Sequence, residues 1–374
     1  MMEMKKERNI PNRTGETADP PCPEACAKLL AEWFARRARD LPWRGIQDPY
    51  GIWISEVMLQ QTRVPVVRER WEAFLARFPS PRELAASDDD SLLAAWEGLG
   101  YYRRVRQLRE AARTLVERHG GRLPEEPEAF AELPGVGPYT KGAVYSLAFD
   151  LPLPAIDGNA ERVIARLLAL EEPARKKPGR QRIEAFVLAM LRHRSPRVIN
   201  QALMDLGAGP CSPKNPECHL CPLQSPCRAR QEGTSSLFPV LPPRPRPTPV
   251  ETHLLLALHG SCFLGRRIPK GEVNQGQIGL PGLGLPLPQK RSLEEYIREN
   301  LGAGAQAGPP LGSFNHSITR YKITVHVHPL QLHGPVQEPF AWFPRNGSLP
   351  LSTVTRKTLA RFQQSLEQGG GSRA

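Results

Sequence analysis

The sequence lacks any apolar run that approaches the length of a membrane-spanning helix, which takes about 20 residues. Its first residues, MMEMKKERNIPNRTGETADPP, also lack an apolar core, so we expect a disordered polar tail over residues 1–21 and no secretory signal. Acidic residues are fewer than basic ones. The sequence has 38 Asp and Glu and 50 Lys and Arg, so its formal net charge is +12. This balance suits a polyanionic partner, either nucleic acid or a membrane surface.

Cysteine is sparse, and four of the seven cysteines are concentrated in one short stretch. In a chain that we expect to be cytoplasmic, such clustering indicates a metal site rather than disulfides. The stretch has the spacing C-x6-C-x2-C-x5-C over Cys211, Cys218, Cys221 and Cys227. Structural zinc usually takes two separated CxxC pairs or Cys/His pairs, and only one CxxC is present here. A cubane [4Fe-4S] cluster fits better, with zinc and four unrelated thiols as the alternatives. We treat Cys22, Cys26 and Cys262 as ordinary thiols.

A change in composition divides the chain into two modules. Up to Arg230, apolar residues recur at helical spacing, and short connections with Gly or Pro separate the segments. The expected helices lie at 22–40, 64–78, 102–118, 140–149, 159–170 and 181–191. Proline is dense over residues 231–250, which predicts an extended linker.

The C-terminal part has a different pattern. Strand-like runs occur at 252–260, 262–267 and 321–332, and the last alternates apolar and polar residues over Ile323, Val325 and Val327. A closing helix is expected at 353–366 and a tail at 367–374. The expected fold class is therefore multidomain, with an all-α module over 22–230 and a smaller α+β module over 251–366.

A Gly-Val-Gly turn stands between two helical segments in LPGVGPYTKGAV, at Leu133–Val144. Gly135 and Gly137 permit a tight turn and close approach of the backbone, and Pro138 suits the first position of a helix. The free N–H groups of the turn and of the helix start, as far as Thr140, can receive a phosphate. The pattern is typical of the helix-hairpin-helix of DNA-binding proteins, and the alternative is an ordinary helix–helix connection.

The hairpin, an aspartate 20 residues after Gly137 and the cysteine loop, in this order, resemble the endonuclease III superfamily of DNA glycosylases. Two further stretches, WISEVMLQQTRV at Trp53–Val64 and WEGLGYYRRVRQL at Trp96–Leu108, are similar to the adenine DNA glycosylase (MutY) family. The resemblance is close from Cys26 to Cys227 and weaker beyond.

This resemblance implies a particular organisation of the two modules. The helical module would be a helix-hairpin-helix glycosylase with a six-helix subdomain at 44–155 and a cluster subdomain formed by 22–43 and 156–230. The C-terminal module would be a degenerate Nudix-like domain that reads the lesion. The hydrolase box of that fold is incomplete here, because SLEEYIRENLGA keeps only Glu294, Glu295 and Glu299, so we expect no nucleotide pyrophosphatase activity.

The resemblance also implies the catalytic residues. Glu56 matches the family's catalytic acid, and its apolar neighbours should raise its pKa so that a neutral carboxyl can protonate adenine at N7. Asp157 matches the carboxylate that stabilises the sugar cation or bonds to it transiently. Asp157 also suits the N-cap of the following helix, and both roles can hold. Tyr139 and Asn159 would complete the site by positioning the sugar and Asp157 or by polarising the water.

Tyr139 stands at the hairpin position where bifunctional relatives carry the lysine that forms a Schiff base. Lys141 lies two residues on, roughly 200° around a helix, so it should not replace that lysine. We therefore expect a monofunctional glycosylase.

Other residues are candidates for DNA contact. Gln61, Tyr101 and Tyr102 match residues that wedge into the base stack, with core packing as the alternative for either ring. Lys214 in the cysteine loop would contact phosphate or remain a solvated surface charge. Thr319, between Ile318 and Arg320, aligns with the family's lesion-reading turn, although both of its neighbours differ from that pattern and a plain turn explains it equally well.

The expected activity is excision of adenine opposite 8-oxoguanine or guanine in double-stranded DNA. We expect the protein to be a monomer that contains a [4Fe-4S] cluster and is associated with the nucleoid in the cytoplasm. Because a base inside the duplex is out of reach, it must be flipped out of the stack. The alternatives are a bifunctional glycosylase/lyase that acts on oxidised pyrimidines, a glycosylase that excises thymine from G·T mismatches, and a non-catalytic DNA-binding scaffold.

Overall fold

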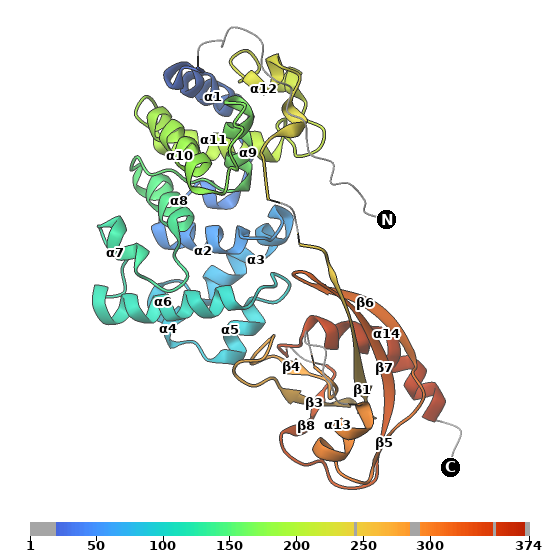
Figure 1. Ribbon diagram of the computed structural model, residues 1–374. Helices are drawn as coiled ribbons and strands as arrows, with labels where there is room; N and C mark the ends of the chain where they lie inside the picture. Colours follow the sequence, from blue (N-terminus) through green and yellow to red (C-terminus); the bar gives the residue numbers. More distant parts are fainter. Residues whose placement is uncertain (1–19, 243–244, 285–291, 347–348, 371–374) are drawn as a thin grey trace, which may run out of the picture. The chain divides into compact units, whose positions relative to one another are not determined.

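The computed structural model describes residues 20–242, 245–284, 292–346 and 349–370. Nearly all of the expected N-terminal tail 1–21 and residues 371–374 of the expected C-terminal tail lie outside these ranges. The chain divides into two compact units, each taken by itself below (Figure 1). The helical unit comprises Met1–Ala86 and Arg103–Pro243, and the C-terminal unit comprises Ser87–Tyr102 and Arg244–Ala374.

The described part of the helical unit contains no β-strand. Its α-helices are α1 (Pro23–Arg37), α2 (Pro49–Leu59), α3 (Val64–Arg77), α4 (Pro81–Ala86), α6 (Arg103–His119), α7 (Pro127–Ala131), α8 (Pro138–Phe149), α9 (Gly158–Leu167), α10 (Lys177–Leu191), α11 (Pro196–Ala208) and α12 (Arg228–Gln231). Short 3-10 helices lie at Pro42–Arg44, Cys218–Leu220 and Ser235–Leu237. The helices expected from apolar spacing are all present, with shifted ends.

Helix α2 is apolar around most of its circumference and lies at the centre of the helical unit. Residues from Tyr50 to Met58 are all buried. Its N-terminus is fixed by Asp48, whose side chain accepts hydrogen bonds from the amides of Tyr50 and Gly51. A helix that is apolar all round is stable only inside a core, and α2 packs against α3 and α8. Any polar side chain on α2 is therefore held in an apolar environment.

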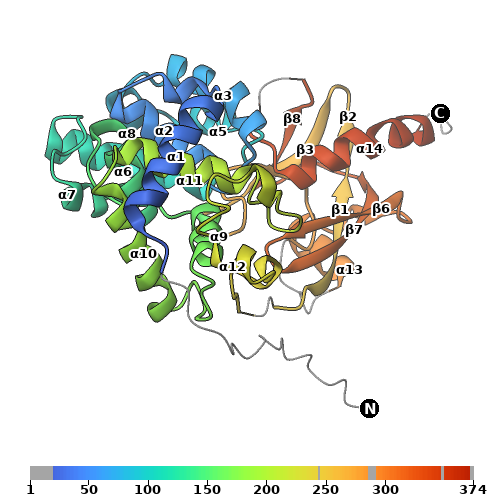
Figure 2. The same cartoon turned by 90° about the horizontal axis from the view of Figure 1, so that it is seen from above.

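A second core joins the start of the chain to residues more than 120 positions further on. Leu30 and Ala27 of α1 pack with buried residues of α9, α10 and α11, and Cys211 and Leu223 belong to the same core. Figure 2 shows α1 beside α10 and α11 from above. This packing gives the cysteine-bearing loop a rigid support.

The C-terminal unit contains two four-stranded sheets. In the first, β1 (Thr248–Leu256) runs parallel to β7 (Tyr321–Leu332), which pairs antiparallel with β5 (Ala305–Ala307) and β6 (Gly312–Ile318). In the second, β3 (Cys262–Arg267) pairs with β2 (Leu258–His259), β4 (Ile278–Gly279) and β8 (Phe340–Pro344). The helices of the unit are α5 (Asp89–Ala95), α13 (Leu293–Asn300) and α14 (Thr353–Gly370).

The alternation expected along β7 is confirmed, because Ile323, Val325 and Val327 are all buried in the core of the unit. Strand β1 starts at Thr248, inside the segment 231–250 that its proline content assigned to the linker. Helix α14 starts at Thr353 as expected and continues to Gly370, into the segment expected as a tail. Two-residue and three-residue strands such as β4 and β5 are too short to produce a period in the sequence.

Two ion pairs tie α5 and the residues after it to the rest of the C-terminal unit. Arg267 of β3 contacts both carboxylate oxygens of Asp90, at 2.7 and 3.1 Å, and Arg356 of α14 lies 2.6 Å from Glu97. No pattern in the sequence indicated that residues 87–102 would pack with strands that begin some 150 positions later.

Within the described ranges, no helix has both the length and the apolar character that membrane crossing requires.

Candidate active site

A cavity of about 690 Å³ opens in the helical unit, a volume within the range of small-molecule sites. Four residues that the sequence singled out as catalytic line it together: Glu56, Tyr139, Asp157 and Asn159. Gln61 lies on the same wall. These side chains come from α2, from α8 and from the start of α9, so packing brings together residues separated by about a hundred positions.

Glu56 is the buried carboxyl of the cavity, with 3% of its surface exposed. Its Oε2 accepts a hydrogen bond of 2.6 Å from the hydroxyl of Tyr139. Burial, with a smaller contribution from the charge of Asp157, raises the pKa of Glu56 to about 7, although the Tyr139 hydrogen bond and the charge of Arg44 act in the opposite direction. A large fraction of Glu56 therefore carries its proton at neutral pH.

Tyr139 lies in the first turn of α8, directly after the hairpin. Burial and the nearby carboxyls of Glu56 and Asp157 raise its pKa well above the ordinary value, so it remains a neutral phenol. Lys141 is held outside the cavity, because its Nζ contacts both carboxylate oxygens of Glu128, at 2.8 and 3.0 Å. The position next to Glu56 thus offers a hydroxyl and no amine.

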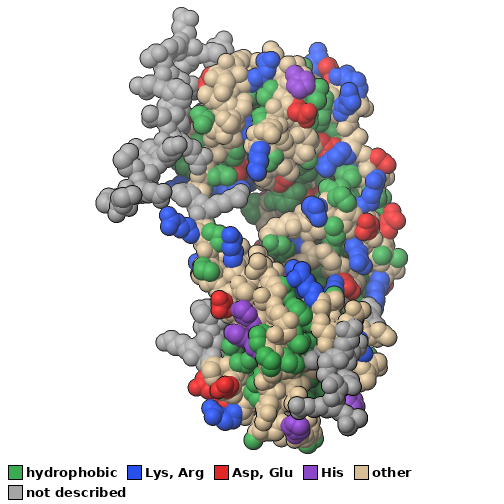
Figure 3. All heavy atoms as spheres, turned by 90° about the vertical axis from the view of Figure 1, so that its right-hand side faces the viewer, with side chains coloured by type: hydrophobic (Ala, Val, Ile, Leu, Met, Phe, Trp, Pro, Cys, Tyr) green, Lys and Arg blue, Asp and Glu red, His purple; other side chains and the backbone are tan. Residues whose placement is uncertain are grey.

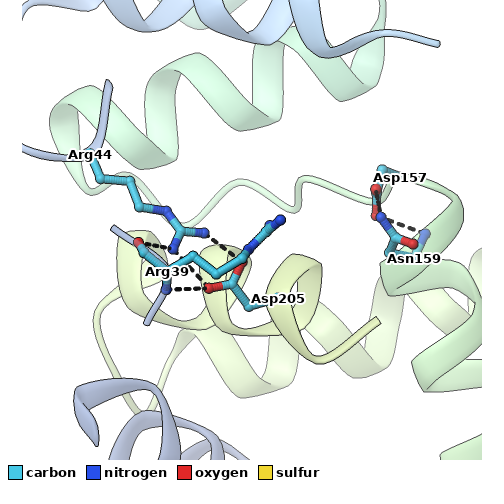
Figure 4. A network of polar contacts seen from close by, with 5 residues as sticks. All are labelled: Arg39, Arg44, Asp157, Asn159 and Asp205. Carbon is cyan, nitrogen blue, oxygen red and sulfur yellow. Dashed lines mark hydrogen bonds and ion pairs between the residues drawn. The ribbon is translucent and has the colours of Figure 1, made fainter. Parts of the chain in front are cut away.

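Asp157 is the N-cap of α9 and also lines the cavity. As the N-cap of α9, its Oδ1 accepts hydrogen bonds from the amides of Asn159 at 2.9 Å and Ala160 at 2.8 Å, and it also lines the cavity. Its Oδ2 accepts a bond of 2.7 Å from Nδ2 of Asn159 (Figure 4). Burial raises the pKa of Asp157, and the hydrogen bonds from Ala160 and Asn159 partly offset that effect.

Asn159 is itself oriented by a buried arginine. Nη2 of Arg162 donates to Oδ1 of Asn159 at 3.0 Å and to the carbonyl of Gly207 at 2.7 Å, and Nε donates to the carbonyl of Cys211 at 2.9 Å. Because its oxygen is taken by Arg162, the Asn159 amide can only present its N–H to Asp157. The cysteine loop and the cavity are thus joined through one guanidinium.

A buried carboxylate behind two arginines of the cavity wall was not found by sequence reasoning. Asp205 of α11 is buried and accepts two parallel hydrogen bonds from Arg44, each of 2.7 Å, and one of 2.6 Å from Nε of Arg39 (Figure 4). Arg39 and Arg44 line the cavity. Although burial alone would raise the pKa of Asp205, its hydrogen bonds and the charges of Arg44 and Arg39 lower it. Asp205 is 161 positions from Arg44, so no local spacing could indicate the pair.

The hairpin forms as its glycines predicted. Gly135 has a φ of +81°, which is unfavourable for other residues, and Gly137 caps α8 with Pro138 at the helix start. The side chain of Thr140 is turned inward: it is 2% exposed and accepts a hydrogen bond of 3.2 Å from Gln60. The Thr140 hydroxyl therefore does not face outward, whereas Gly135 and Pro138 of the same segment are exposed.

Three of the residues proposed to contact DNA share an unusual backbone conformation. Gln61, Tyr101 and Thr319 have φ values of +60°, +46° and +50°, among only six such non-glycine residues in the described ranges. All three side chains are exposed. Positive φ is costly for side chains of this kind and tends to occur at functional sites. Tyr101, Tyr102 and Thr319 belong to the C-terminal unit, so the cavity of the helical unit brings together only Gln61 from this set.

On the face shown in Figure 3, Lys and Arg side chains are spread over the surface and interspersed with acidic ones. Lys214 is exposed in the cysteine loop.

The four clustered cysteines surround one small cavity in the helical unit, consistent with a shared group. A buried guanidinium lies beside them: Nη1 of Arg166 is 3.3 Å from Sγ of Cys211 and 2.7 Å from the carbonyl of Ser212. Such a cation would offset the charge of bound thiolates. Within the described residues, no three His, Cys, Asp or Glu groups converge closely enough to hold a single metal ion. Thiols arranged around a void fit a cluster of several metal atoms better than one zinc ion.

Comparison with known proteins agrees with this site. Residues 54–187 match the model of the HhH-GPD superfamily base excision DNA repair protein. The chain is 38% identical over 225 residues to the adenine DNA glycosylase of Mus musculus, a match covering 58% of this chain and 44% of that protein. For the adenine DNA glycosylase of Buchnera aphidicola subsp. Schizaphis graminum, identity is 33% over 215 residues, covering 57% and 62%.

A solved structure, that of a thermostable thymine-DNA glycosylase, superimposes with a TM-score of 0.53 at 27% identity and covers 56% of this chain and 97% of that one. The matched stretch spans less than half of the mouse relative, and most of residues 54–187, which match the family model, lie in the helical unit. The resemblance to adenine DNA glycosylases is confirmed, and residues 54–187 are similar to the HhH-GPD superfamily of base excision DNA repair proteins.

Proposed function

We propose that this protein is a DNA glycosylase that hydrolyses the bond between adenine and deoxyribose in double-stranded DNA, where the adenine lies opposite 8-oxoguanine or guanine. The observation that carries the proposal is the shared cavity of Glu56 and Asp157, in which one carboxyl has its pKa raised to about 7 and the other caps a helix. An adenine flipped out of the duplex would enter this cavity.

Glu56 would act as the general acid. Adenine leaves poorly as an anion, and a proton delivered to N7 makes it a neutral leaving group. The proton must come from an acid that is still protonated near neutral pH, a condition that the burial of Glu56 meets. The Tyr139 hydroxyl, which donates to Oε2 of Glu56, would hold the carboxyl in position.

Asp157 would stabilise the positive charge that develops on the sugar as the bond breaks, by charge or by a transient bond to C1′. Three hydrogen bonds to its two oxygens favour the ionised form and fix its orientation. Asn159, itself held by Arg162, supplies one of these bonds. Water then completes the hydrolysis. No lysine is among the described residues that line the cavity, and Lys141 contacts Glu128 instead, which supports a monofunctional enzyme.

We further propose that Cys211, Cys218, Cys221 and Cys227 hold a [4Fe-4S] cluster. When bound, the cluster would act as a structural clamp on the loop that carries Lys214. The loop's carbonyls at Cys211 and Ser212 accept from Arg162 and Arg166, so ordering this loop also orders the support of Asn159.

The C-terminal unit is proposed as a Nudix-like domain that reads 8-oxoguanine. Thr319 supports this role, because it lies in the two-residue turn between the paired residues Ile318 and Tyr321 and is exposed at positive φ. Of the glutamates in the incomplete hydrolase box, Glu295 caps α13 through Ser292. It therefore serves the helix rather than a metal ion. A monomer close to the nucleoid remains a prediction.

Release of free adenine from a duplex with a single A:8-oxoguanine pair tests the activity. Matched duplexes with A:G, G:T and an oxidised pyrimidine would separate the proposal from thymine excision and from a bifunctional enzyme. Adenine release without strand cleavage supports the proposal. Excision of thymine or a pyrimidine in place of adenine, or binding without any base release, contradicts it.

A further inference from the structure

Asp205 is a buried carboxylate that the proposed reaction does not use. Its side chain is 2% exposed, whereas those of Arg44 and Arg39 are 14% and 38% exposed. Arg44 binds both oxygens of Asp205 at 2.7 Å and also donates to the carbonyl of Arg39 at 3.0 Å. A planar guanidinium in this two-bonded arrangement has little freedom to turn.

Arg44 shares the cavity with Glu56, and its charge opposes the state that Glu56 needs. A cation near a carboxyl favours ionisation, and Arg44 does lower the pKa of Glu56 against the larger effect of burial. An Arg44 without a counter-ion would act more strongly, because the interior screens charges weakly. Asp205 supplies that counter-ion through its two contacts with Arg44.

We propose that Asp205 is a positioning residue for the acid step: it holds Arg44 against the cavity wall and neutralises its charge, so that Glu56 keeps its proton. The inference rests on the proposed role of Glu56 as general acid. It assigns Asp205 no contact with the substrate.

Several other titratable or charged groups act on Glu56 or line the same cavity. Tyr139 from α8 and Asp157 from the start of α9 are the remaining titratable groups that act on it. Further charged side chains of the cavity wall are Arg39, Arg63, Glu161, Arg175 and Arg197. Glu161 is paired with Arg175 at 3.1 Å.

The two partners of the ion pair should shift the pH profile in opposite directions. Glu56 must be protonated, so activity is present below its pKa and is lost as pH rises through it. In Asp205→Asn, Arg44 has lost its counter-ion and lowers the pKa of Glu56. The decline in adenine release at alkaline pH should then occur about one pH unit lower than in the wild type. In Arg44→Met, the positive charge is removed while the negative charge of Asp205 remains. The pKa of Glu56 should rise, and adenine release should decline at a higher pH than in the wild type. In the double variant, which combines Arg44→Met and Asp205→Asn, the summed charge of the two positions is zero, as in the wild type. Adenine release should therefore decline close to the wild-type pH.

The experiment measures single-turnover adenine release against pH for these variants of the full-length protein, with thermal unfolding as a check of folding. Glu128→Gln is the matched control, since it breaks the Glu128–Lys141 ion pair away from the cavity and should leave the profile unchanged. The double variant removes the charges of Arg44 and Asp205 together, so neither of these two is left unpaired, and only the more exposed Arg39 loses its contact with Asp205.

Opposite shifts with recovery in the double variant support the proposal. Shifts in the same direction, or none, overturn it, because a role in packing alone would not reverse sign. The infrared carboxyl band of Glu56, assigned by its loss in Glu56→Gln, follows the same ionisation without turnover. If the wild type released no adenine, the proposed function would be wrong, and this band would still decide the role of Asp205.

Discussion

Two buried carboxyls of the helical unit differ in how they are paired. Glu56 and Asp205 are almost equally buried, at 3% and 4% exposed, yet the pKa of Glu56 is raised and that of Asp205 is lowered. Glu56 has a neutral phenol as its hydrogen-bond partner, whereas Asp205 has two guanidinium groups. Burial disfavours both carboxylates, so the partner decides which of them keeps a proton.

The largest effect on the rate of adenine release is expected for Glu56→Gln, which removes the acidic proton. Glu56→Gln keeps the size and the amide can still contact Tyr139, but it has no acidic proton to give. We expect the rate of adenine release to fall by about 10²–10⁴-fold while the affinity for duplex DNA is retained. Single-turnover kinetics and a gel-shift titration would measure the two quantities. A variant with near wild-type release would remove Glu56 from the acid role.

Asp157 permits a separation of catalysis from helix capping. Asn is as good an N-cap as Asp, so Asp157→Asn should keep the cap and a thermal midpoint above that of Asp157→Ala, although Nδ2 of Asn159 loses its acceptor at Oδ2. The charge beside the sugar is lost, and we expect adenine release to slow by about 10²-fold or more. Asp157→Ala should lose the same activity and in addition about 1 kcal/mol of stability. An active Asp157→Asn protein would reduce the role of Asp157 to the cap.

The pH dependence follows from the sign of the Glu56 shift. Its pKa is raised to about 7, so the protonated fraction falls as pH rises through that value. Single-turnover adenine release should therefore decrease about tenfold per pH unit on the alkaline side. An alkaline limb that stays flat from pH 6 to pH 9 would contradict the assignment of a protonated glutamate.

The smallest effect is expected at the exposed turn of the C-terminal unit. Loss of one hydrogen bond in Thr319→Ala should reduce the preference for A:8-oxoguanine over A:G about fivefold, equivalent to about 1 kcal/mol. Asn274→Ala is a matched control, because Asn274 also has positive φ in the same unit. The ratio of release rates on the two duplexes measures the effect. An equal change in both variants would indicate a general effect of backbone strain.

The sequence by itself determined the features that depend on neighbours along the chain. The spacing of apolar residues predicted the helices, Asp157 before Gly158 predicted a cap, and Gly135 with Pro138 predicted the turn into α8. The alternation of apolar and polar residues along β7 likewise depends only on neighbours in the sequence. The pairing of Glu56 with Asp157 came from the family resemblance, not from local pattern.

Only the tertiary structure decided the electrostatics of the cavity. The pKa of Glu56 depends on burial by α3, α8 and the elements around them, and the Arg44–Asp205 pair joins residues 161 positions apart. The inward turn of Thr140 and the packing of residues 87–102 with the C-terminal unit were also invisible in the sequence. The physical reason is that desolvation and charge pairing depend on distance in space, whereas helix periodicity and capping depend on distance along the chain.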